Sequence, residues 1–102
     1  MAIEYREPWH EVQDDKLRAA LQRQYQLEIS SLHQLWDRKG LVIGQNKASD
    51  DVLVRLADGC FAIVHLVWSA GPGDAIYPNA TLYQSASELS QALALDAENL
   101  NS

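Results

Sequence analysis

Apolar residues in the first third of the chain recur every three or four positions. This spacing predicts an amphipathic helix from Asp14 to about Ile29 that covers a core. Its start is open, because Asp14 can cap the helix while Pro8 equally suits the first turn of a helix beginning near Glu7. The stripe facing the core is formed by Leu17, Ala20, Leu21, Tyr25 and Glu28.

Three runs rich in β-branched residues follow and predict the strands of an antiparallel meander: Leu41 to Gln45, Val52 to Leu56, and Cys60 to Trp68. The third run is apolar except at His65, so it belongs inside the sheet with both faces covered. Between the second and third runs, Ala57-Asp58-Gly59 predicts a tight turn in which glycine takes the positive φ.

Glycine and proline interrupt regular structure after Trp68, and a loop is expected as far as about Asn79. Thr81 to Tyr83 is a candidate short strand. Ser85 and Glu88 form a capping box ahead of a second helix, from Ala86 to about Leu95, and residues 96–102 are expected to fray. The chain is therefore predicted to be a single α+β domain spanning residues 1–102, with an N-terminal helix, a three-stranded antiparallel meander and a C-terminal helix.

The register of the second hairpin depends on its turn. A two-residue turn pairs Ala57 with Cys60 and separates Arg55 from His65, whereas a three-residue turn with Gly59 as a bulge places His65 opposite Asp51. The second register is preferred because it makes one face wholly apolar, with Val52, Val54, Leu56, Cys60, Ala62, Val64, Leu66 and Trp68. The other face is then mixed, with Asp51, Leu53, Arg55, Phe61, Ile63, His65 and Val67.

The amino-acid composition and net charge exclude some classes of function. Of the 102 residues 47% are hydrophobic and 22% charged, which is typical of a soluble globular domain. The net charge of -6 has the wrong sign for neutralising phosphates, so nucleic acid and anionic membranes are not expected partners. One cysteine and a start without basic and apolar signal regions favour the cytoplasm.

One segment carries a family resemblance. Residues 50–69, Asp-Asp-Val-Leu-Val-Arg-Leu-Ala-Asp-Gly-Cys-Phe-Ala-Ile-Val-His-Leu-Val-Trp-Ser, resemble a pattern in small uncharacterised bacterial proteins. Those proteins have an Asp-Asp-Val-Leu hairpin ending in Val-His-Leu-Thr-Trp, and Val67 stands here in place of the threonine. Because no activity is assigned to the group, the resemblance implies a compact bacterial cytosolic domain and assigns no residue a role.

The sequence contains no catalytic signature. Cys60 has no base or helix start near it in sequence to activate a thiolate, and Ser69 lacks the glycine two residues earlier that a nucleophile turn needs. His10, His33 and His65 are too widely spaced to predict a metal site. We therefore expect no catalytic residue, no metal and no cofactor.

Polar residues that interrupt apolar strands, and aromatic residues with enough area to line a cleft or anchor an interface, supply the candidate binding residues, which are Asp51, Arg55, His65, Trp36, Trp68 and Tyr77. The favoured function is a non-catalytic protein-interaction module that forms a homodimer, because an uncovered apolar sheet face favours self-association. The competing arrangement covers both faces within one chain, with the first helix and Leu32 to Trp36 on one face and the last helix on the other. The acidic charge also suits a basic protein partner. The alternative is a small-molecule binding domain or minor enzyme with a pocket near Arg55, His65, Trp36 and Trp68.

Overall fold

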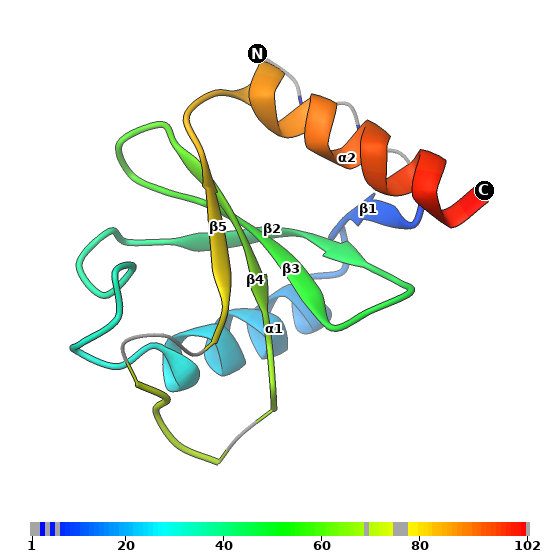
Figure 1. Cartoon of the computed structure of the whole chain (residues 1–102). Helices are drawn as coiled ribbons and strands as arrows, with labels where there is room; N and C mark the ends of the chain where they lie inside the picture. The colour runs from blue at the N-terminus through cyan, green and yellow to red at the C-terminus, as the bar shows by residue number, and fades with distance from the viewer. Residues whose placement is uncertain (1–2, 4, 6, 69, 75–77, 102) are drawn as a thin grey trace.

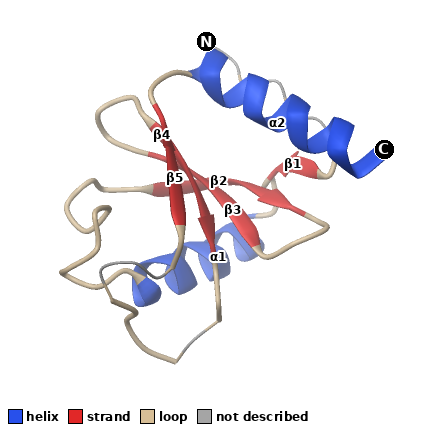
Figure 2. Cartoon of the chain, in the orientation of Figure 1, coloured by secondary structure: helices blue, strands red, loops and turns tan. Residues whose placement is uncertain are grey.

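The computed structural model describes residues 3, 5, 7–68, 70–74 and 78–101 and shows two helices and a five-stranded antiparallel sheet (Figures 1 and 2). The elements are β1 Trp9–Glu11, α1 Asp15–Glu28, β2 Leu41–Asn46, β3 Asp51–Arg55, β4 Phe61–His65, β5 Ala80–Tyr83 and α2 Ala86–Asn101. The predicted α+β class is confirmed.

The first helix starts where Asp14 caps it, which settles the choice between Asp14 and Glu7. The Asp14 carboxylate accepts hydrogen bonds from the backbone N–H groups of Lys16, at 2.8 Å, and Leu17, at 3.3 Å. The second helix starts at the predicted capping box, because the N–H of Glu88 donates to the Ser85 hydroxyl. It ends at Asn101, beyond the Leu95 that the sequence predicts.

The sheet has five strands in the order β1-β2-β3-β4-β5, and the predicted three-stranded meander is its centre. The sequence analysis missed β1 altogether and kept the candidate strand at Thr81 to Tyr83 outside the meander. Both are short edge strands of three and four residues, too brief to show an alternating pattern. Because β5 joins the sheet, β4 has a hydrogen-bonded neighbour on each side. This is the interior position that its apolar composition predicts.

The preferred hairpin register is confirmed. Asp51 lies opposite His65 and Arg55 opposite Phe61, while the N–H of Leu56 donates to the Cys60 carbonyl at 2.9 Å. Gly59 adopts a φ of 89°, which a residue with a Cβ resists, so the three-residue turn depends on glycine here.

Three layers result, with the sheet between the two helices (Figure 1). One core lies between α1 and the apolar sheet face, and it includes Leu21, Tyr25, Val54 and Val64. The second lies under α2, where Leu89 and Leu93 pack with Leu53 and Phe61 of the mixed face. α2 therefore covers Leu53 and Phe61 of the mixed face within one chain. Arg55, His65 and Val67 of the same face remain exposed, so only part of the surface from which a homodimer was predicted is covered.

Candidate functional site

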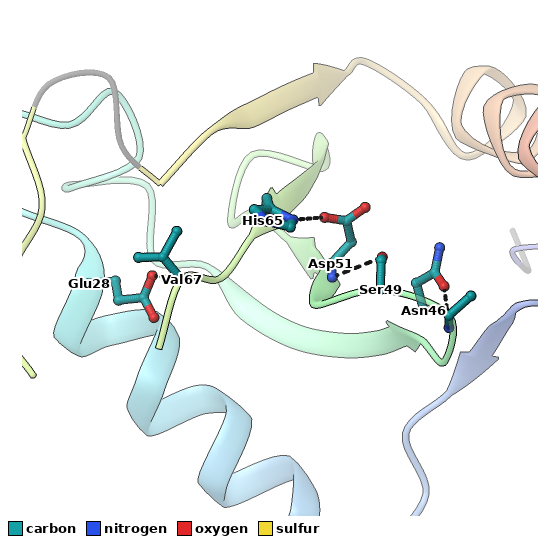
Figure 3. Close-up of polar contacts among 7 residues, drawn as sticks. Glu28, Asn46, Ser49, Asp51, His65 and Val67 are labelled. Atoms are coloured by element: carbon teal, nitrogen blue, oxygen red, sulfur yellow. Dashed lines mark hydrogen bonds and ion pairs between the residues drawn. The ribbon is translucent and has the colours of Figure 1, made fainter. Parts of the chain in front are cut away.

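Two of the candidate residues form a pair on the mixed face. The Nδ1 atom of His65 lies 2.7 Å from the Asp51 Oδ1 atom, and Figure 3 shows the two side chains pointing toward one another from neighbouring strands. The pair is partly exposed, with 50% of the His65 side chain and 27% of the Asp51 side chain accessible, so it contributes little to stability. The pair orients His65, but no metal-binding group of three His, Cys, Asp or Glu residues occurs in the described part of the chain.

The other candidate residues do not join this pair in one pocket. Arg55 is exposed four residues farther along β3, about 13 Å away at the usual rise of a strand. Trp36 lines a cavity with Tyr25, Gln26, Ile29, Leu35, Lys39 and Gly40, and this set includes neither Arg55, His65 nor Trp68. Tyr77 lies outside the described residues.

A buried carboxylate that the sequence analysis did not single out organises the end of the molecule where α1 stops. Glu28 is fully buried, and its two carboxylate oxygens accept hydrogen bonds from the backbone N–H groups of Val67 and Trp68, each at 2.9 Å. The Gln24 side chain donates a third, at 2.6 Å, to the Glu28 Oε2 atom. Figure 3 shows Glu28 beside Val67. A buried charge is tolerated only when it is hydrogen-bonded in this way.

Trp68 is held through its backbone N–H, which donates a hydrogen bond to Glu28, while its side chain remains half exposed. Its backbone adopts a φ of 57°, a left-handed conformation that is costly for a bulky residue, and 53% of its surface is exposed. The predicted apolar face ends before Trp68, because β4 stops at His65 and the left-handed backbone turns the chain away from the strand. Strain at an exposed aromatic residue is typical of functional surfaces.

Further hydrogen bonds join the loop after β4 to the segment after α1. The N–H of Gly73 donates to the Glu28 carbonyl at 2.9 Å, and the Nε2 atom of His33 lies 2.8 Å from the Pro78 carbonyl oxygen. Because a carbonyl only accepts, His33 Nε2 carries the proton, while Nδ1 accepts from the N–H of Leu35. His33 is thus a neutral, buried structural link rather than a ligand.

Exposed apolar area gathers at this end. We call the surface formed by the last turn of α1 and residues 30–40, 66–68 and 70–74 the loop end. Of the eight large apolar side chains exposed in the described part of the chain, five lie here: Leu27, Leu32, Trp36, Val67 and Trp68. Trp9, in contrast, is buried under α2.

An ion pair fixes the base of the loop end to the turn between β3 and β4. The Arg38 guanidinium lies 2.7 Å from the Asp58 carboxylate, and the N–H of Ala57 donates to the Arg38 carbonyl. The pKa of Asp58 is lowered, first by the hydrogen bond from the Cys60 N–H and then by Arg38. The same hydrogen bond with Asp58 raises the pKa of Arg38.

The Tyr25 phenol gives a pH-dependent prediction. Burial raises the pKa of Tyr25 to about 12, against the opposing effect of Arg38, and burial also raises the pKa of Tyr5 to about 12. Since the unfolded phenol titrates near pH 10, the stabilisation from keeping these groups neutral is complete below about pH 10 and is lost as the pH rises toward about 12. Urea unfolding across this range should show a falling free energy of unfolding, with a shallower fall for Tyr25→Phe. An unchanged slope in Tyr25→Phe would mean that Tyr25 titrates normally.

Comparisons with known proteins add no assignment. No protein-family model matches the chain, and neither a curated protein nor a solved structure matches it. None of the helices in the described part of the chain combines the length and hydropathy that a bilayer span requires. The function must therefore be argued from the site.

Proposed function

We propose that this chain is a non-catalytic protein-interaction module that contacts its partner through the loop end. The observation that carries the proposal is the presentation of Trp68, whose strained backbone is held by a fully buried carboxylate while its side chain stays half exposed. Tryptophan is the residue type most enriched among interface residues with large binding contributions. A rigid, exposed tryptophan also loses little conformational freedom on binding.

The partner that fits best is a basic protein. The chain carries a net charge of -6, and exposed Asp37 and Asp74 lie in the two loops of the loop end. The loop end also holds the exposed Lys39 and the paired Arg38, so it is the charge of the whole chain that favours a basic partner. Such a charge accelerates association with a positively charged surface and makes the association rate sensitive to salt.

A homodimer is the other partner class that the sequence suggested. The support that remains for it is the exposed apolar area of the loop end, because α2 packs against Leu53 and Phe61. Sedimentation at tens of micromolar distinguishes the two classes. If the wild type is a dimer and the Trp68→Ala variant is a monomer, the loop end is the surface of self-association. If the wild type is itself a monomer, the partner of the loop end is a different protein.

Affinity capture with a matched control tests the proposal. The immobilised full chain, its Trp68→Ala variant and its Leu95→Ala variant are exposed to the same lysate; Leu95 is equally exposed, at 59%, but lies on α2. We expect one basic protein to be retained by the wild type and by Leu95→Ala, and its purified form to bind Trp68→Ala at least about tenfold more weakly. Equal binding by Trp68→Ala would contradict the proposal.

A further inference from the structure

A cavity of about 260 Å³ lies between the second half of α1 and the segment that leads into β2. Its wall combines the apolar side chains of Ile29 and Leu35 with the rings of Tyr25 and Trp36. This volume is slightly below the range of pockets for drug-sized ligands, so it suits a molecule with a single ring system.

One of the residues that line the cavity carries a buried polar group without a partner in the described part of the chain. The Tyr25 hydroxyl is buried, and among the described residues it has no hydrogen-bond partner. An unpaired buried hydroxyl costs about 1–3 kcal/mol, so its presence needs an explanation. The adjacent lining residue is Gly40, where an added Cβ atom would lie 2.5 Å from both the Tyr25 hydroxyl oxygen and a Val54 methyl carbon, so the hydroxyl packs closely against the Gly40 backbone and a larger residue would displace it.

The charge of the cavity is opposite to that of the whole chain. Of the described residues that line it, only Lys39 is charged, although the net charge of the protein is -6. Lys39 is exposed and has a φ of 52°, an uncommon conformation for a residue with a side chain. The neighbouring cation, Arg38, is paired with Asp58, which leaves Lys39 as the cation available to a ligand.

We propose that this cavity binds a small organic anion with one flat apolar ring, of which an aromatic carboxylate is the simplest case. The ring lies against Trp36 and Leu35, the carboxylate binds the Lys39 ammonium group, and the Tyr25 hydroxyl donates a hydrogen bond to a carboxylate oxygen. Because the hydroxyl is inaccessible in the present arrangement, this last contact requires the rings that line the cavity to shift on binding. The cavity lies within the loop end, but Trp68, which carries the proposed function, is not among the described residues that line it.

Titration of the full ¹⁵N-labelled chain with benzoate, followed by two-dimensional NMR, tests the proposal. We expect saturable shifts at the amides of Lys39 and Gly40 and at the Trp36 indole N–H, with benzamide binding at least about fivefold more weakly because it carries no charge. Lys39→Gln should weaken benzoate binding by about tenfold, and Lys47→Gln, which removes an exposed lysine elsewhere, should leave it unchanged. Shifts that do not saturate, or equal affinities for benzoate and benzamide, would overturn the proposal.

The Tyr25→Phe variant tests the role of the hydroxyl without disturbing the core. Since that hydroxyl has no partner in the described structure, its removal should leave the protein folded, which the NMR spectrum itself reports. Benzoate binding should become about three- to tenfold weaker. A folded variant with wild-type affinity would show that the hydroxyl takes no part in the site.

Discussion

Replacing Glu28 by alanine is expected to lower the free energy of unfolding by about 3 kcal/mol, in line with the loss of hydrogen bonds to a buried charged group. The carboxylate accepts three hydrogen bonds, and two of them come from consecutive backbone N–H groups of the loop after β4. Its removal leaves those donors without a partner and opens space at the end of α1. Urea unfolding followed by circular dichroism measures the change.

Two further variants, Glu28→Gln and Glu11→Gln, compare the same substitution at the buried site and at an exposed site. Glutamine keeps the shape and one acceptor oxygen but sets an amide NH₂ group against a backbone donor, so about 2 kcal/mol should still be lost. Glu11 is exposed on β1, and the same substitution there should change stability by less than about 0.5 kcal/mol. Similar small losses for Glu28→Gln and Glu11→Gln would show that Glu28 is not the buried link described above.

Replacing Leu93 by alanine is expected to cost about 3 kcal/mol, because it opens a cavity in the core between α2 and the sheet. Leu93 is fully buried there together with Leu89, Leu53 and Phe61. Leu95 is two residues farther along the same helix and exposed, so Leu95→Ala should cost less than about 0.5 kcal/mol. Denaturant unfolding of the two variants compares them directly.

The pair of leucine variants also tests how the mixed sheet face is covered. If a second chain covered this face and α2 did not, Leu93→Ala would have a small effect, and the stability of the wild type would depend on protein concentration. The described packing predicts a large effect of Leu93→Ala that is independent of concentration.

The centre of the fold could be predicted because its signals are local. Gly59 with Asp58 specified the turn, and the alternation of apolar residues on either side of it selected the register that pairs Asp51 with His65. The capping box at Ser85 located the start of α2 in the same way. These features depend on residues a few positions apart, where the sequence pattern is informative.

The loop end could not be predicted because it depends on contacts distant in sequence, and β1 was missed because it is only three residues long. Glu28 lies on the apolar stripe of α1, and a charged residue in that position was the available signal of a buried partner. Its partners, however, are the backbone N–H groups of Val67 and Trp68, about forty residues away. Every non-proline residue has such a group, so the sequence does not show which ones Glu28 binds. For the same reason Trp68 was assigned to the apolar strand face.

The cavity at Tyr25 could not be predicted from the sequence for a related reason. The periodicity of α1 placed Tyr25 on the core side, which is correct, but the missing partner of its hydroxyl is a property of the packed structure. Trp36 was recognised as a candidate, whereas Lys39 and Gly40 show no pattern that distinguishes them from ordinary turn residues.

Amide hydrogen exchange of Val67 and Trp68 tests the central claim, that Glu28 holds the loop after β4 and thereby presents Trp68. We expect both amides of the wild-type protein to exchange much more slowly than exposed loop amides, and Glu28→Gln to speed the exchange of these two amides more than that of the β3 and β4 amides. Fast exchange of Val67 and Trp68 in the wild-type protein, or rates unchanged in a folded Glu28→Gln variant, would contradict it.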